Sequence, residues 1–220
     1  MTTAPGSTEL PEGRPRHGVW WRPDRASWWM GVLFAVGSLC FALAAFVSQW
    51  ASAPRPGIGV TFFVGSIFFT VAAFVQWRSA PNEPRGTEWW ASSIQLAGTL
   101  FFNVSTFAGM KHGFDARQSD LRVWTPDVLG SICFLVSSEL AYADVCRRWF
   151  CVRPRSLSWR IAALNLVGSI AFGVSAVTSL IEPSTQEPVS AAIANAGTTV
   201  GALCFLAGGL MLLPEAAQED

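Results

Sequence analysis

The sequence has few of the residues on which soluble enzymes depend. Only 14% of its 220 residues are charged, against about 25% in an average soluble domain, and it contains two histidines and one tyrosine. It has no glycine-rich phosphate loop, no zinc-spaced cluster of cysteine and histidine, and no Ser/His/Asp set. We therefore expect no enzymatic activity, no metal site and no cofactor. The net charge of zero gives no reason to expect a nucleic-acid partner.

Six long stretches of the sequence carry almost no charge, whereas a soluble protein would have charged residues throughout. Each of them is close to the ~20 apolar residues that cross ~30 Å of hydrocarbon as a helix. The six stretches are Trp28–Val47, Ile58–Trp77, Trp89–Met110, Val128–Val145, Ile161–Ile181 and Val189–Leu213. A soluble bundle would leave such helices almost no polar face for water. The sequence therefore predicts an all-α integral membrane protein with six transmembrane helices.

The basic residues orient the predicted spans. Most of the 15 Lys and Arg residues lie in the N-terminal tail or after the second and fourth stretches, and only Arg55, Lys111, Arg117 and Arg122 fall on the other side. Because Lys and Arg gather in cytoplasmic segments, both termini are predicted to be cytoplasmic. Residues 1–26 are predicted to be a disordered cytoplasmic tail, and residues 214–220 an acidic one.

A possible signal peptide is the alternative interpretation of the first stretch. The "ASA" of residues 51–53 resembles a cleavage site. The apolar run before it is longer than the 7–15 residues of a signal core, however. We therefore expect this stretch to remain as the first span.

One short phrase is repeated in all six stretches. It begins with glycine, has phenylalanine four residues later and a small residue seven residues later. The pairs are Gly37 and Phe41, Gly65 and Phe69, Gly98 and Phe102, Gly130 and Phe134, Gly168 and Phe172, and Gly201 and Phe205. These offsets fall on one face of a helix, and close backbone approach holds helices together in lipid. We expect a neighbour's phenylalanine to fill the groove at each glycine; the alternative is an aromatic-lined pore or pocket.

Tryptophan divides the six stretches into two classes. Trp28, Trp89 and Trp159 each lie nine residues before the glycine, in the first, third and fifth stretches only. The repeated unit is therefore predicted to be a two-helix hairpin, at about 27–80, 88–150 and 158–213. Since each hairpin crosses twice, the three repeats are parallel, and we expect them to pack as one bundle over residues 27–213.

Three segments carry a resemblance to a known family. They are "FFVGSIFFTVAAF" (Phe62–Phe74), "QLAGTLFFNVSTF" (Gln95–Phe107) and "ALNLVGSIAFGVSAV" (Ala163–Val177). These segments resemble bacterial, especially actinobacterial, membrane proteins with YrhK-like domains, over about residues 27–213. The resemblance implies two-helix units of the size of one hairpin, in a bacterial plasma membrane. The family is functionally uncharacterised, so the resemblance implies no activity and no active-site residues.

Polar residues within the spans suggest one candidate site. Glu139 lies about 12 Å from the predicted cytoplasmic end, and Gln95 and Asn165 lie about 9 Å from it. Ionisable groups in hydrocarbon mark functional sites, so Glu139 is a candidate proton or cation acceptor, with Tyr142 one turn away as a hydrogen-bond partner. Alternatively, Gln95 and Asn165 join helices, and Glu139 stays neutral or reaches Arg160. Glu139 lies about 180° from the glycine face, which favours this alternative.

Five cysteines predict no disulfide framework. Cys146 and Cys151 flank "RRWF" on the predicted cytoplasmic side, where thiols stay reduced. The basic, aromatic segment Val145–Arg155 fits either contact with anionic headgroups or charge that sets topology.

The sequence as a whole favours a non-enzymatic multi-pass membrane protein. We expect it to act through helix packing with itself as a homo-oligomer, with membrane lipids, or with a membrane-protein partner. The alternative is a small proton- or cation-coupled transporter or channel that uses the polar layer around Glu139.

Overall fold

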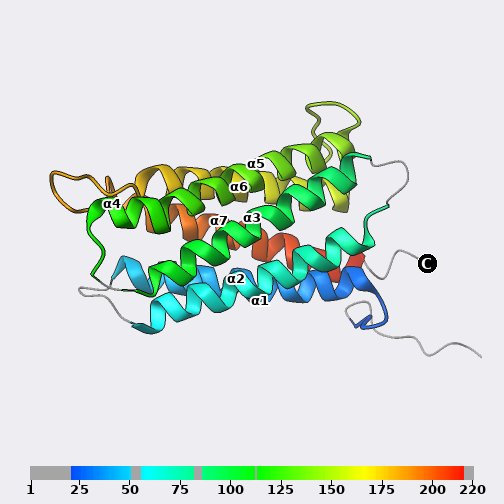
Figure 1. Cartoon of the computed structure of the whole chain (residues 1–220). Helices are drawn as coiled ribbons and strands as arrows, with labels where there is room; N and C mark the ends of the chain where they lie inside the picture. Colours follow the sequence, from blue (N-terminus) through cyan, green and yellow to red (C-terminus); the bar gives the residue numbers. More distant parts are fainter. Residues whose placement is uncertain (1–20, 51–55, 82–85, 112, 216–220) are drawn as a thin grey trace, which may run out of the picture.

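The fold, obtained as a computed structural model, is all-α over the residues that it describes, 21–50, 56–81, 86–111 and 113–215 (Figure 1). The long helices are α1 (Ala26–Gln49), α2 (Pro56–Ser79), α3 (Thr87–Gly109), α5 (Thr125–Cys146), α6 (Leu157–Thr178) and α7 (Ala191–Glu215). The short helix α4 (Ala116–Ser119) and the π-helical turn η1 (Asp120–Trp124) lead into α5. Most of each predicted tail, residues 1–20 and 216–220, lies outside the described residues, as does the "ASA" segment.

The long helices form a closed ring in chain order. Each packs against the next, and α7 returns to pack against α1. Glycines permit this closing contact: a Cβ built on Gly31 would lie 2.8 Å from the carbonyl oxygen of Gly209. A Cβ on Gly209 would in turn lie 3.1 Å from the carbonyl oxygen of Gly31. The two backbones are therefore closer together at this crossing than any larger residue would permit.

Within the described residues, five helices are long and apolar enough to cross a membrane. They are Ala26–Gln49, Gly57–Ser79, Ala116–Cys146, Leu157–Thr178 and Ala191–Pro214. The remaining long helix, α3, carries Glu88, Gln95 and Asn103, which lower its hydropathy.

The distribution of side chains is the reverse of that in a soluble protein. The buried hydrophobic residues of the described chain are mainly alanine and phenylalanine, with no leucine or valine among them. Large aliphatic residues instead lie on the outside: Leu43, Leu100 and Ile132 are each 52% exposed. Soluble proteins bury such residues, whereas helices in lipid turn them outward and pack through small residues. The fold is that of a membrane protein.

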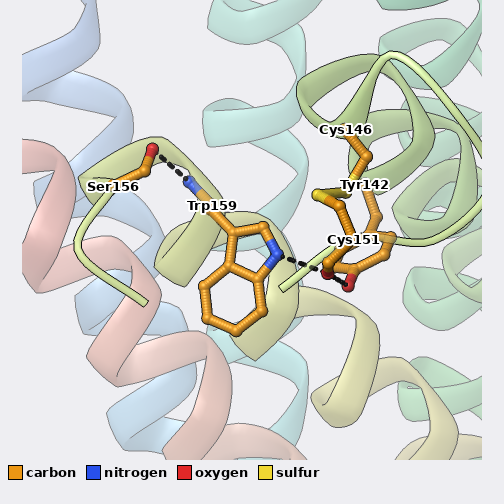
Figure 2. Close-up of a disulfide and its surroundings, with 5 residues drawn as sticks. All are labelled: Tyr142, Cys146, Cys151, Ser156 and Trp159. Carbon is orange, nitrogen blue, oxygen red and sulfur yellow. Dashed lines mark hydrogen bonds between the residues drawn. A yellow bond between two sulfur atoms is a disulfide. The ribbon is translucent and has the colours of Figure 1, made fainter. Parts of the chain in front are cut away.

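A disulfide lies at the turn between α5 and α6 (Figure 2). The expectation that Cys146 and Cys151 stay unpaired is wrong here, because the two sulfurs are bonded and the Cα atoms are 5.5 Å apart. Helix α5 ends at Cys146, and Arg147 has a left-handed backbone with φ 56° that turns the chain back. The carbonyl of Cys151 also accepts hydrogen bonds from the Tyr142 hydroxyl and from Trp159 Nε1, the latter at 3.0 Å. These contacts fix the base of the turn.

Candidate functional site

Six phenylalanine rings meet in the middle of the bundle, and we call this cluster the phenylalanine plug. Its members are the repeated residues Phe41, Phe69, Phe102, Phe134, Phe172 and Phe205. Rings from α1, α3 and α6 form one triangle, with centroids 6.1, 6.2 and 6.5 Å apart. Rings from α2, α5 and α7 form a second triangle, with centroids 5.6, 5.9 and 6.1 Å apart. The plug fills the centre of the ring, where an aromatic-lined pore would need open space.

Each ring of the plug lies on a glycine of the paired helix. A Cβ built on Gly37 would lie 2.9 Å from Phe69 Cδ2, and a Cβ on Gly65 would lie 2.9 Å from Phe41 Cδ2. The same reciprocal contacts join Gly98 with Phe134, Gly130 with Phe102, Gly168 with Phe205, and Gly201 with Phe172. The groove at each glycine is thus occupied by the ring of the neighbour.

One further repeated position was missed by the sequence analysis. The residue directly after each repeated glycine is small and buried: Ser38, Ser66, Thr99, Ser131, Ser169 and Ala202. The signal was present in the sequence, because this position is serine, threonine or alanine in every repeat. The small side chain lets helices approach on both sides of the glycine.

A cavity of about 820 Å³ lies at the end of the bundle that carries α4, and we call it the α4-end cavity. Phe41, Phe102 and Phe172, which form one triangle of the plug, line it. Trp124 and Ile181 also line it, from the two segments that connect helices at this end. The cavity therefore extends from the plug to the connecting segments of the chain.

Hydrogen bonds join the segment before α5 to the end of α6 and to the segment between α6 and α7. Trp124 Nε1 donates to the carbonyl of Ala176 at 2.8 Å, which ties η1 to α6. The backbone N–H of Ile181 donates to Asp120 Oδ1 at 3.1 Å. The N–H of Ala116 donates to Gln186 Oε1 at 3.0 Å. The segment before α5 and the segment between α6 and α7 therefore form one connected structure at this end, and π-helical turns such as η1 are frequent at functional sites.

Polar groups of two kinds line the α4-end cavity. The Ser175 hydroxyl is satisfied, because it lies 2.7 Å from the carbonyl oxygen of Ala194 and 2.7 Å from Thr198 Oγ1. The carboxylate of Asp127 also lines the cavity but forms no hydrogen bond or ion pair with any described residue. The ammonium of Lys111, another lining residue, lies 5.5 Å from the centroid of the Phe107 ring. Asp127 is thus an unpaired acid on a mostly apolar wall.

A second cavity, of about 290 Å³, lies toward the disulfide, and we call it the disulfide-end cavity. Gln95 and Asn165 both line it, so the structure brings these two predicted site residues together. Glu88 and Asp144 supply its carboxylates, and Gln76 contributes a buried Oε1 without a hydrogen-bond partner. Both acids lie near helix ends, and the sequence analysis identified neither of them as a site residue. Among the described residues, no cluster of three or more His, Cys, Asp or Glu could hold a metal ion.

Glu139 and Tyr142, the other two predicted site residues, lie elsewhere. Glu139 is half-buried, lines neither cavity and forms no hydrogen bond or ion pair with the described residues. The Tyr142 hydroxyl donates to the carbonyl of Cys151, and not to Glu139 as expected. Arg160, the suggested partner of Glu139, donates through Nε to the carbonyl of Pro154 at 2.7 Å. The acid and the two amides are therefore not assembled into one site.

No family model matches the chain, and neither a curated protein nor a solved structure matches it. These comparisons neither support nor contradict the resemblance to YrhK-like membrane proteins.

Proposed function

We propose that the chain is a non-enzymatic, six-span protein of a bacterial plasma membrane, with both termini in the cytoplasm. It acts through helix packing with itself, with lipid or with a membrane-protein partner. The observation that carries this proposal is the apolar exterior around a core of small residues and phenylalanine. The sixth span is α3, whose 23 residues extend about 35 Å and pack between α2 and α5.

The repeated unit in this proposal is the hairpin. Reciprocal contact between glycine and phenylalanine occurs within α1–α2, within α3–α5 and within α6–α7. This pattern supports three parallel hairpins and is the basis for keeping the YrhK-like resemblance as a proposal. A hairpin alone would leave its two phenylalanine rings uncovered on the side away from the glycines, and the three hairpins bury these rings against one another in the plug.

A second candidate function, a small proton- or cation-coupled carrier, is favoured by the two cavities. They lie on opposite sides of the plug, so each could give access to the middle of the bundle from one end. In this case the polar layer uses Gln95 and Asn165 with the carboxylates of Glu88 and Asp144, because Glu139 does not line the cavity. The packed plug excludes a permanently open channel.

Reconstitution into liposomes separates the two functions. A trapped pH-sensitive dye reports proton flux for the wild type, for Asp144→Asn and for Glu139→Gln as a matched control on the same helix. The packing function predicts no flux above that of empty liposomes in any of the three. A flux that is lost in Asp144→Asn and retained in Glu139→Gln would replace it with the carrier function. If the packing function is right, native mass spectrometry of the same three proteins should show bound lipid or a second copy of the chain.

A further inference from the structure

We propose that the α4-end cavity is a binding site for a small organic cation with an apolar or aromatic body, whose charged group pairs with Asp127. This inference goes beyond the proposed function, which assigns no ligand to the bundle. It concerns one cavity and one carboxylate, and it does not depend on the number of spans.

The size and lining of the cavity fit a small-molecule site. Its volume of about 820 Å³ lies within the roughly 300–1,000 Å³ of ligand pockets, which are mostly apolar with a few well-placed polar groups. Phe41, Phe102 and Phe172 supply a wall of aromatic rings. The hydroxyl of Ser105, on the same wall, is buried and takes no part in any hydrogen bond to the described residues.

The charge of the ligand follows from Asp127. Asp127 is half-buried on the cavity wall, where a carboxylate that loses water is unfavourable unless a cation or hydrogen-bond donors compensate it, and the described residues supply neither. Lys111 is exposed and its ammonium lies over the Phe107 ring, so it leaves the carboxylate unpaired. A neutral ligand could compensate the carboxylate only through hydrogen-bond donors and would leave its charge unpaired, and an anion would be repelled by it. A cation satisfies the carboxylate.

The aromatic wall favours an organic cation over a metal ion. Phenyl rings attract cations at their faces, and quaternary ammonium groups are the ligands that protein aromatic clusters bind in this way. This end of the bundle already shows such contacts: the Arg122 guanidinium lies 5.2 Å from the Phe114 ring centroid. Among the described residues no group of three or more His, Cys, Asp or Glu could hold a metal ion, and the cavity offers one carboxylate.

The experiment compares two probes of the same shape. One is a dansyl compound with a trimethylammonium group, and the other is its neutral tert-butyl analogue. Both are titrated into the protein in nanodiscs, and dansyl fluorescence reports entry into an apolar site. Empty nanodiscs give the partition background. The proteins are the wild type, Asp127→Asn, and Glu139→Gln, which removes an acid from the same helix outside the cavity.

We expect saturable binding of the cationic probe to the wild type, at one site per chain. Asp127→Asn should weaken it by about tenfold or more, Glu139→Gln should leave it unchanged, and the neutral probe should bind weakly to all three. Absence of saturable binding to the wild type would overturn the proposal. Equal affinity of wild type and Asp127→Asn, or equal affinity for both probes, would overturn it as well.

A second measurement keeps the proposal testable where Asp127→Asn does not fold. Asn195 lines the same cavity. In the variant Asn195→Cys, the cationic probe should slow maleimide labelling of this cysteine, whereas the neutral probe should not. A labelling rate unaffected by a saturating concentration of the cation would contradict the assignment.

Discussion

The ring of Phe41 lies against Gly65, so that a Cβ on this glycine would lie 2.9 Å from Phe41 Cδ2. The same Cβ would lie 2.9 Å from Cys40 Cβ and 3.1 Å from the carbonyl oxygen of Gly37. Helices α1 and α2 therefore approach closely enough that a methyl group has no room between them. The bundle depends on six contacts of this kind.

The first prediction concerns this contact. Gly65→Ala should destabilise the bundle by about 1–3 kcal/mol, because the added methyl group must displace the ring and the α1 backbone. Thermal unfolding in mild detergent measures the effect. The matched control is Gly173→Ala in α6, where a Cβ would meet nothing within 4 Å. This control should be neutral or stabilising by up to about 1 kcal/mol; equal losses in both variants would show that the close contact is not the cause.

The second prediction concerns the phenylalanine plug. Phe134 is 2% exposed, and its ring contacts Phe102 with centroids 5.0 Å apart. Phe134→Ala should cost about 3–5 kcal/mol, because it leaves a cavity at the centre of the ring of helices. Phe74 on α2 is 49% exposed, so Phe74→Ala should change the unfolding temperature little. A similar small effect for both variants would contradict a packed plug.

The third prediction concerns the disulfide. Purified protein kept without reductant should have its free cysteines, Cys40, Cys133 and Cys204, available for alkylation after denaturation, and Cys146 and Cys151 only after reduction. Reduction should lower stability by about 2 kcal/mol, as expected for so short a closed loop. Alkylation of Cys146 without reductant would show that the bond is absent.

The fourth prediction concerns the hydrogen bond between Trp124 and Ala176. Trp124→Phe keeps an aromatic ring on the cavity wall but removes the donor at 2.8 Å from the Ala176 carbonyl. We expect a loss of about 1 kcal/mol. Trp149→Phe is the control, because Trp149 is 75% exposed in the α5–α6 turn. Its unfolding temperature should match that of the wild type.

Much of the fold follows from local features of the sequence. The first apolar stretch, Trp28–Val47, lies inside α1 (Ala26–Gln49), because the length of an apolar run limits a helix directly. The groove at Gly37 and the ring of Phe69 could be expected to meet, because offsets of four and seven residues fix a helical face. The ring closure through Gly31 and Gly209 could not, since no local pattern states which helices become neighbours.

The candidate sites depended on geometry that the sequence does not contain. The sequence position of Glu139 gives its distance along α5, but this distance alone does not give the direction in which the side chain points. Glu88 and Asp144 line the cavity because two helix ends meet there, and each residue alone resembles an ordinary interfacial charge. The predicted cytoplasmic location implies free thiols at Cys146 and Cys151, whereas the left-handed turn at Arg147 brings the two cysteines together.

The disulfide and the basic residues give opposite predictions for the compartment that the disulfide end of the bundle faces. Disulfides persist in oxidising compartments, whereas Arg153 and Arg155 favour the cytoplasm. The proposed topology, with both termini in the cytoplasm, is the one that the basic residues favour. The topology of the chain in a membrane would therefore decide between these two predictions.

Labelling of single cysteines with a membrane-impermeant maleimide, on spheroplasts of a bacterial host, tests this topology most directly. The sites are Ser79→Cys and Arg155→Cys at the disulfide end, and Gln118→Cys and Ser184→Cys at the α4 end, in a background without native cysteine. Six spans with cytoplasmic termini predict that the first pair is labelled only after lysis and the second pair on intact spheroplasts. Labelling of Arg155→Cys but not of Ser79→Cys on intact spheroplasts would show that α3 does not cross the membrane. Labelling of both would show the reverse orientation. Either result contradicts six spans with cytoplasmic termini.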